Sequence, residues 1–205
     1  MNVIYSNGMY RSGSTLIYNV LKKIVQDHKL DYKIKKAHEE WLQWVKDSDL
    51  SIYTYRDVRD ATASMMRKRN LTVENFKSYN NHTLSSFILK LMTHDLKVKD
   101  KGNNILVLEY NNDILNLENG IKKIGEFLDI DIGKGSTFYY SKIFSLETQK
   151  KFVNGLSKHD LNTEYHPGHI GDGKTDFKKY FNYDQLNPNT LELMGKWLKK
   201  HDYKL

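Results

Sequence analysis

Hydrophobic and polar positions along the chain follow two alternating spacings, one typical of buried strands and one typical of amphipathic helices. Short runs rich in β-branched and aromatic residues predict strands at 2–6, 32–38, 50–55 and 104–110. Apolar residues at helical spacing predict helices at 14–28, 39–47, 57–70, 73–100, 114–130 and 186–203. Segments 131–143 and 155–183 carry most of the remaining glycines, and we assign no helix or strand to them. The alternation predicts an α/β fold with three layers, α/β/α, and a central, mostly parallel sheet with helices on both faces.

The chain has 205 residues, enough for one well-buried α/β domain, and we predict a single domain over residues 1–205. It has no cysteine, which excludes disulfides, thiolate metal sites and cysteine nucleophiles. A net charge of +7 suggests an anionic ligand, although basic proteins also use such charge for solubility. No segment approaches the roughly 20 apolar residues of a membrane span, and the N-terminus lacks the pattern of a signal peptide. We therefore expect a cytoplasmic protein.

The segment "NGMYRSGSTL", residues 7–16, lies between the first predicted strand and the first predicted helix. It fits the phosphate-binding pattern G-x-x-x-x-G-K-[ST] except that Ser14 replaces the lysine, and the nearest cation, Arg11, comes three residues earlier. Backbone N–H groups of residues 12–15 are expected to face an anion at the positive end of the helix. The alternative is a plain turn with a serine N-cap, but the position after the first strand favours phosphate or sulfate binding.

A second segment, "YTYRDVRDATASMMRKR", places Arg56 at the end of a predicted strand and Ser64 about two helical turns later. The guanidinium and the hydroxyl could converge on a further anion, because a bidentate guanidinium suits phosphate. In the alternative interpretation, Arg56 and Arg59 pair with the neighbouring Asp57 and Asp60 on a solvated face.

Two further segments are candidates for catalysis or ligand binding. Lys36 and His38 lie two residues apart and so share one face at the end of a predicted strand. A histidine is a natural general base near neutral pH, and an adjacent lysine can stabilise negative charge. The glycine-rich segment 165–181 is predicted to be either a ligand-binding loop or an ordinary surface loop.

Taken in this order, the segments resemble the sulfotransferases that use 3′-phosphoadenosine 5′-phosphosulfate (PAPS), a branch of the P-loop NTPase-like fold. "YRSGST" resembles the family's 5′-phosphosulfate loop P-K-S-G-T-T, and residues 56–64 resemble its 3′-phosphate signature R-N-x-K-D-x-x-x-S. Lys36-Ala37-His38 resembles K-T-H, and residues 168–174 resemble part of the loop R-K-G-x-x-G-D-W-K. The implied cofactor-binding residues are Arg11, Ser12, Gly13, Ser14, Thr15, Arg56, Ser64, Gly168, His169 and Gly171.

The resemblance implies transfer of the sulfuryl group of PAPS to a hydroxyl acceptor by in-line displacement. His38 is the implied general base, with Glu39 or Glu40 as alternatives, while Arg11 and Lys36 neutralise charge. No metal is required, and the acceptor is a small molecule, a sugar or a peptide tyrosine rather than a nucleic acid. His166-Pro167 replaces the family's R-K pair, and the K-x-x-x-T-V-x-x-x-E dimerisation motif is not found, so the oligomeric state stays open.

Two other functions are compatible with parts of the sequence. A P-loop kinase of nucleotides or small molecules needs a lysine at the Ser14 position and an acid that holds magnesium, and neither is evident. A non-catalytic domain that binds polyanions or nucleic acid fits the basic charge, but predicts cations spread along a groove rather than gathered at strand ends.

Overall fold

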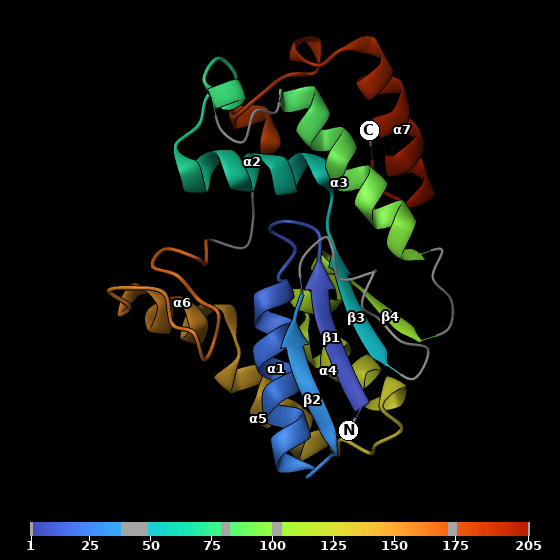
Figure 1. The fold of residues 1–205 in the computed structure, drawn as a ribbon, viewed down its shortest axis with the longest axis vertical. Helices are drawn as coiled ribbons and strands as arrows, with labels where there is room; N and C mark the ends of the chain where they lie inside the picture. Colours follow the sequence, from blue (N-terminus) through green and yellow to red (C-terminus); the bar gives the residue numbers. More distant parts are fainter. Residues whose placement is uncertain (1, 38–48, 79–82, 100–103, 172–175, 205) are drawn as a thin grey trace. The chain divides into compact units, whose positions relative to one another are not determined.

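The computed structural model describes residues 2–37, 49–78, 83–99, 104–171 and 176–204. Its sheet consists of β1 (Asn2–Gly8), β2 (Tyr32–Lys36), β3 (Leu50–Tyr55) and β4 (Ile105–Glu109). The strand order is β2-β1-β3-β4 and all three pairings are parallel. Figure 1 shows the four arrows running the same way. The prediction of an α/β fold with a parallel central sheet is confirmed.

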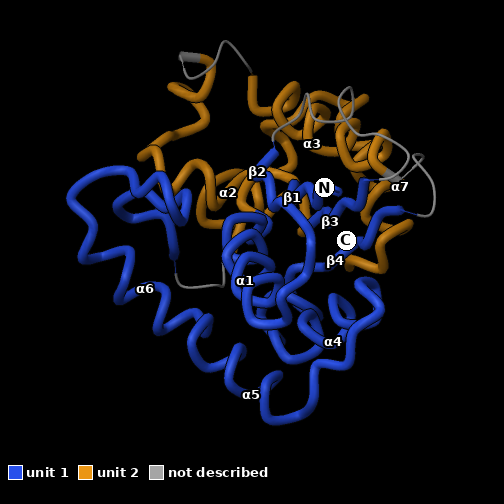
Figure 2. The backbone as a smooth tube through the Cα atoms, turned by 60° about the horizontal axis from the view of Figure 1, so that its bottom comes forward, with its two compact units in different colours: residues 1–8, 12–55, 101–173 blue, residues 9–11, 56–100, 174–205 orange. Residues whose placement is uncertain are grey.

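The described residues form two compact units, shown in Figure 2. Unit 1 comprises residues 1–8, 12–55 and 101–173, and unit 2 comprises residues 9–11, 56–100 and 174–205. The chain therefore passes between the units several times. The prediction of one domain over the whole chain stays a prediction.

Unit 1 contains the sheet and the helices α1 (Ser14–Asp27), α4 (Leu117–Phe127), α5 (Lys134–Ile143) and α6 (Leu146–Asn154). Ile4, Ile52 and Leu108 project from one face of the sheet into a core built with α1 and α4. Apolar residues recur along both helices at the spacing that places them on one side, which explains why the sequence pattern located them. A π-helical turn, η3 (Tyr110–Ile114), joins β4 to α4, which is shorter than its predicted range.

Helices α5 and α6 were not predicted, because neither carries a continuous apolar stripe. In α5 only Tyr140 is buried, while Phe138 and Tyr139 are exposed. In α6 the buried side chains include the polar Gln149. Ser145 caps α6 by accepting a hydrogen bond from the Thr148 N–H, a signal that the sequence does contain.

Unit 2 contains α2 (Val58–Arg69), α3 (Leu84–Lys99), α7 (Pro188–Lys200) and the 3₁₀ turns η2 (Phe76–Ser78), η4 (Phe177–Lys179) and η5 (Tyr183–Gln185). Asp57 caps the start of α2, and Asn70 ends it in the left-handed conformation. Helix α3 packs against α2 and α7. The helix predicted over 73–100 is therefore wrong in its first part, where a 3₁₀ turn precedes α3. The helix predicted over 39–47 lies outside the described residues.

Among the described residues, no helix has the length and apolar character needed to cross a membrane.

Candidate functional site

The first candidate loop connects β1 to α1, and its backbone prepares the helix start for an anion. Gly13 occupies the N-cap position at φ 86, where it provides no side-chain cap. The Ile17 N–H donates to the Gly13 carbonyl at 3.1 Å. The N–H groups before Ile17 in α1 have no acceptor within the helix, because they lie in its first turn. They are suited to bind an anion.

Ser12 anchors this loop to the neighbouring strand β3. Its side chain is fully buried, and its Oγ lies 2.6 Å from Thr54 Oγ1 and 3.0 Å from the Thr54 carbonyl oxygen. The Ser12 hydroxyl is thus engaged within unit 1. The role of Thr54 as the anchor of this loop was not predicted, because nothing in the sequence distinguishes Thr54 from the other residues of β3.

Gly8 must be a glycine because the contact between Ser12 and Thr54 lies directly beside it. A Cβ at this position would lie 2.0 Å from Thr54 Oγ1 and 2.8 Å from the Thr54 carbonyl oxygen. We expect Gly8→Ala to lower the free energy of unfolding by about 1–3 kcal/mol, the usual cost of overpacking. Urea denaturation followed by circular dichroism measures this change. Gly133→Ala is the control, because nothing lies within 4 Å of its added Cβ; equal urea midpoints for the two variants would contradict the steric account.

Lys36 brings a cation to this loop from the end of β2. Its Nζ donates a hydrogen bond to Ser14 Oγ at 2.7 Å. Burial of the ammonium lowers the pKa of Lys36 to about 7, while the carboxylate of Glu164 opposes that shift. The charge of Glu164 therefore does not offset the desolvation of the Lys36 ammonium.

The glycine-rich segment follows a turn that is fixed to α1. Asn19 Nδ2 donates to the Thr163 carbonyl at 2.9 Å, and Lys22 Nζ donates to the Asn162 carbonyl at 2.7 Å. Glu164, in the left-handed region at φ 58, belongs to this turn. The predicted cofactor loop begins four residues later, in the same unit.

Within that loop, Gly168 adopts φ 65 and is exposed, while His169 and Gly171 are half-buried. The rings of His159 and His166 stack with their centroids 4.0 Å apart, and the ring of His169 lies 5.7 Å from that of His166. Among the described residues, no group of three or more histidines and carboxylates is arranged to hold a metal ion.

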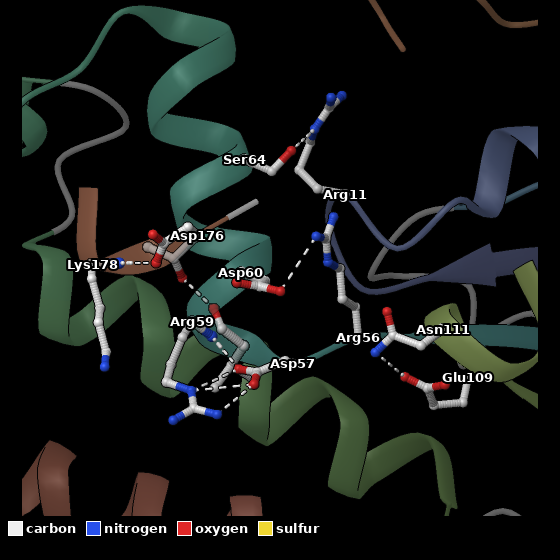
Figure 3. A network of polar contacts seen from close by, with 12 residues as sticks. Arg11, Arg56, Asp57, Arg59, Asp60, Ser64, Glu109, Asn111, Asp176 and Lys178 are labelled. Carbon is white, nitrogen blue, oxygen red and sulfur yellow. Dashed lines mark hydrogen bonds and ion pairs between the residues drawn. The ribbon is translucent and has the colours of Figure 1, made fainter. Parts of the chain in front are cut away.

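In unit 2, Arg11 and Ser64 come together although 53 positions separate them in the sequence. Arg11 Nε donates to Ser64 Oγ at 3.2 Å (Figure 3). Arg11 holds the left-handed conformation at φ 64, which is unusual for an arginine. Lys68 lies one helical turn beyond Ser64 on α2. Burial and the charges of Arg11 and Arg69 lower the pKa of Lys68 to about 8.

Arg56 directly follows β3 in the chain and is 3% exposed. Its Nη2 lies 3.4 Å from Asp60 Oδ2, and the two side chains point toward each other in Figure 3. Arg59 pairs with Asp57 at 2.6 Å. The sequence also allowed ion pairs of the two arginines with neighbouring aspartates on a solvated face. These ion pairs exist, but Arg56, Asp57 and Arg59 are buried rather than solvated. Burial raises the pKa of Asp60 above its usual range, and Arg56 opposes that change.

The structure thus groups the predicted residues by unit: Lys36 with Ser14 in unit 1, and Arg11 with Ser64 in unit 2. His38, Glu39 and Glu40, the candidate bases, lie outside the described residues. The acid at the end of β4, Glu109, accepts hydrogen bonds from the Asn112 N–H and from Asn111 Nδ2.

Comparison with known proteins identifies the class. The family model of the sulfotransferase domain matches residues 43–200, a range that contains the Arg56–Ser64 segment and the glycine-rich loop. The chain belongs to the sulfotransferase family. No curated protein matches it significantly.

Three solved structures share its fold. Mouse sulfotransferase SULT7A1 complexed with PAP has 17% identity and a TM-score of 0.63, with 98% of this chain and 85% of that chain covered. Retinol dehydratase in complex with androsterone and the inactive cofactor PAP has 16% identity and a TM-score of 0.63, covering 99% and 82%. Retinol dehydratase with retinol and PAP has 15% identity and a TM-score of 0.59, with the same coverage. These likenesses agree with the predicted three-layer α/β class.

Proposed function

We propose that this protein is a PAPS-dependent sulfotransferase that transfers a sulfuryl group to the hydroxyl of a small molecule or sugar. The observation that carries this proposal is the Lys36 ammonium held 2.7 Å from Ser14 Oγ at the uncapped start of α1. This arrangement supplies the charge that the lysine of an ordinary phosphate-binding loop supplies from within the loop. Structures of the same fold contain PAP, which supports a nucleotide of this class.

The residues divide between the two ends of the nucleotide. In our assignment, the N–H groups of residues 12–15 bind the 5′-phosphosulfate, with charge from Arg11 and Lys36. Arg56 and Ser64 bind the 3′-phosphate, since a guanidinium and a hydroxyl together match a phosphate group. Gly168, His169 and Gly171 form the loop that covers the nucleotide.

PAPS, when bound, supplies the sulfuryl group that the acceptor receives. His38, or alternatively Glu39 or Glu40, takes the proton of the acceptor hydroxyl, which increases the nucleophilicity of its oxygen. Arg11 and Lys36 neutralise the charge that grows on the leaving phosphate oxygens. The products are a sulfate ester and 3′,5′-adenosine bisphosphate. Two of the similar structures contain androsterone or retinol, and each of these ligands bears a hydroxyl.

A crystal soaked with 3′,5′-adenosine bisphosphate tests this assignment. We expect the 5′-phosphate on the N–H groups of residues 12–15 and the 3′-phosphate within hydrogen-bond distance of Arg56 and Ser64. A bound nucleotide whose ribose phosphate faces away from Arg56 and Ser64 would overturn the assignment.

The low pKa of Lys36 predicts a pH-dependent affinity for the nucleotide. Lys36 titrates at about 7 when no anion is bound, and a bound anion raises this pKa because it stabilises the ammonium. Below pH 7 the ammonium is already protonated; above it, binding must take up a proton. The Kd for 3′,5′-adenosine bisphosphate should therefore increase between about pH 7 and 9, by at most about tenfold per pH unit for one proton.

Lys36→Met should flatten this increase, most clearly between about pH 7 and 8, where Lys36 titrates. Lys33→Met is the matched control, because Lys33 lies on the same strand but is exposed. Calorimetric titrations in buffers of equal ionic strength measure the slopes. An unchanged slope in Lys36→Met would show that another group takes up the proton.

A further inference from the structure

Arg59 lies outside the residues assigned to the nucleotide, yet its side chain is among the most completely engaged in unit 2. It is 5% exposed. Its Nε and Nη2 donate to the Asp57 carboxylate at 3.0 and 2.6 Å. Its Nη1 donates to the Tyr183 hydroxyl at 2.7 Å, and Nη2 also donates to the Lys204 carbonyl at 2.6 Å. The guanidinium lies 4.9 Å from the centroid of the Phe177 ring.

The partners of Arg59 come from distant parts of the sequence. Tyr183 and Lys204 are 124 and 145 positions away from it. The segment that contains Lys204 is itself fixed to α3, because His201 Nε2 lies 3.0 Å from Asp95 Oδ2. Trp197 Nε1 donates to the same carboxylate at 3.1 Å. Arg59 is therefore held in place by a C-terminal segment that is anchored independently.

Asp57, in turn, is the residue through which Arg59 can act on Arg56. Asp57 caps α2 by accepting the Arg59 N–H at 2.9 Å. Both its oxygens are fixed by the Arg59 guanidinium, as Figure 3 shows. Arg56 is the next residue toward the N-terminus, and its own contact with Asp60, at 3.4 Å, is long. Because Asp57 is the adjacent residue, the backbone that Arg59 fixes at Asp57 contributes to the direction of the Arg56 side chain.

We propose that Arg59 is a positioning residue that fixes the Asp57 cap and thereby aims Arg56 at the 3′-phosphate. Tyr183 and the Lys204 carbonyl complete the support from the C-terminal part of the chain. This inference rests on the proposed function, because the 3′-phosphate is the ligand that Arg56 binds there.

The test compares two nucleotides that differ only in the 3′-phosphate. The ratio of the Kd for 5′-AMP to the Kd for 3′,5′-adenosine bisphosphate isolates the contribution of that phosphate. In Arg59→Gln we expect this ratio to fall about tenfold, the loss expected when one charge-assisted hydrogen bond is misaligned. The Kd for 5′-AMP should change by less than about twofold. In Tyr183→Phe the ratio should fall by about threefold, because the hydrogen bond between Arg59 and the neutral Tyr183 hydroxyl is removed.

A variant that leaves no unpaired buried charge separates positioning from misfolding. Arg59→Gln leaves the buried Asp57 carboxylate without its guanidinium partner. The double variant Asp57→Asn with Arg59→Gln removes both charges and keeps a capping side chain. We expect the double variant to fold and to show the same fall in the ratio. Arg59→Lys should recover part of the ratio, because it keeps the charge but not the planar fork.

Lys196→Gln is the control, because it also removes one positive charge from unit 2, at an exposed ion pair with Glu192. Its ratio should equal that of the unmodified protein. An unmodified protein that does not prefer the bisphosphate would overturn the proposed function. A preference that survives in folded Arg59→Gln and in the double variant, or an equal loss for both nucleotides, would overturn the positioning role alone.

Discussion

Arg56→Ala will weaken the binding of 3′,5′-adenosine bisphosphate by about 100-fold, since a bidentate guanidinium–phosphate contact is worth roughly 3 kcal/mol. The side chain is 3% exposed, so the contact forms where water competes little. The Kd for 5′-AMP should change by less than about threefold, because 5′-AMP lacks the 3′-phosphate that we assign to Arg56. Isothermal titration calorimetry with both nucleotides measures the two values.

Two further variants make the Arg56 result specific. Arg56→Lys keeps the charge but loses the planar fork, and should give an intermediate loss. Arg69→Ala removes a cation at the exposed end of the same helix, and its effect on the Kd should be small. An equal loss for 5′-AMP and the bisphosphate in Arg56→Ala would mean that Arg56 supports the fold rather than the 3′-phosphate.

Arg11→Met will reduce kcat for sulfuryl transfer by about 10²–10³, the usual cost of removing one group that stabilises transition-state charge. In the proposed function Arg11 is the cation of the phosphosulfate loop, and its Nε donates a hydrogen bond to Ser64 Oγ at 3.2 Å. The Kd for the bisphosphate should change much less than kcat, because the leaving phosphate gains its charge during the reaction. Transfer of radiolabelled sulfate from PAPS to a hydroxyl acceptor found by screening phenols, alcohols and sugars measures kcat.

Arg11→Lys is the matched variant, because the family's 5′-phosphosulfate loop P-K-S-G-T-T has a lysine at this position. It should retain most of the activity, since it keeps the positive charge. A kcat for Arg11→Met within about threefold of the unmodified protein would remove Arg11 from the chemical step.

The fold was predictable where local signals and burial agree. The four strands were located because each places apolar residues in one buried core, as Ile4, Ile52 and Leu108 do. Helix α2 was predicted closely because Asp57 and Asn70 mark its two ends. Helix α5 was not, because its exposed aromatic residues give no one-sided pattern, and its burial depends on Tyr140 alone.

The site was predictable only in its local parts. The spacing of Arg56 and Ser64 lies within one strand-to-helix segment and can be read directly from the sequence. The contact between Lys36 and Ser14 joins residues 22 positions apart and depends on the pairing of β2 with β1. The support of Arg59 by Tyr183 and Lys204 depends on how the C-terminal part packs, which no local pattern contains.

The most direct test of the central claim is a calorimetric titration with 3′,5′-adenosine bisphosphate, 5′-AMP and ATP, each with and without magnesium at equal ionic strength. A sulfotransferase should bind the bisphosphate at least about tenfold more tightly than 5′-AMP or ATP, with no dependence on magnesium. Tighter, magnesium-dependent binding of ATP would identify a kinase instead. Equal binding of all three that falls steeply with salt would indicate a surface for polyanions, and either result would contradict the account.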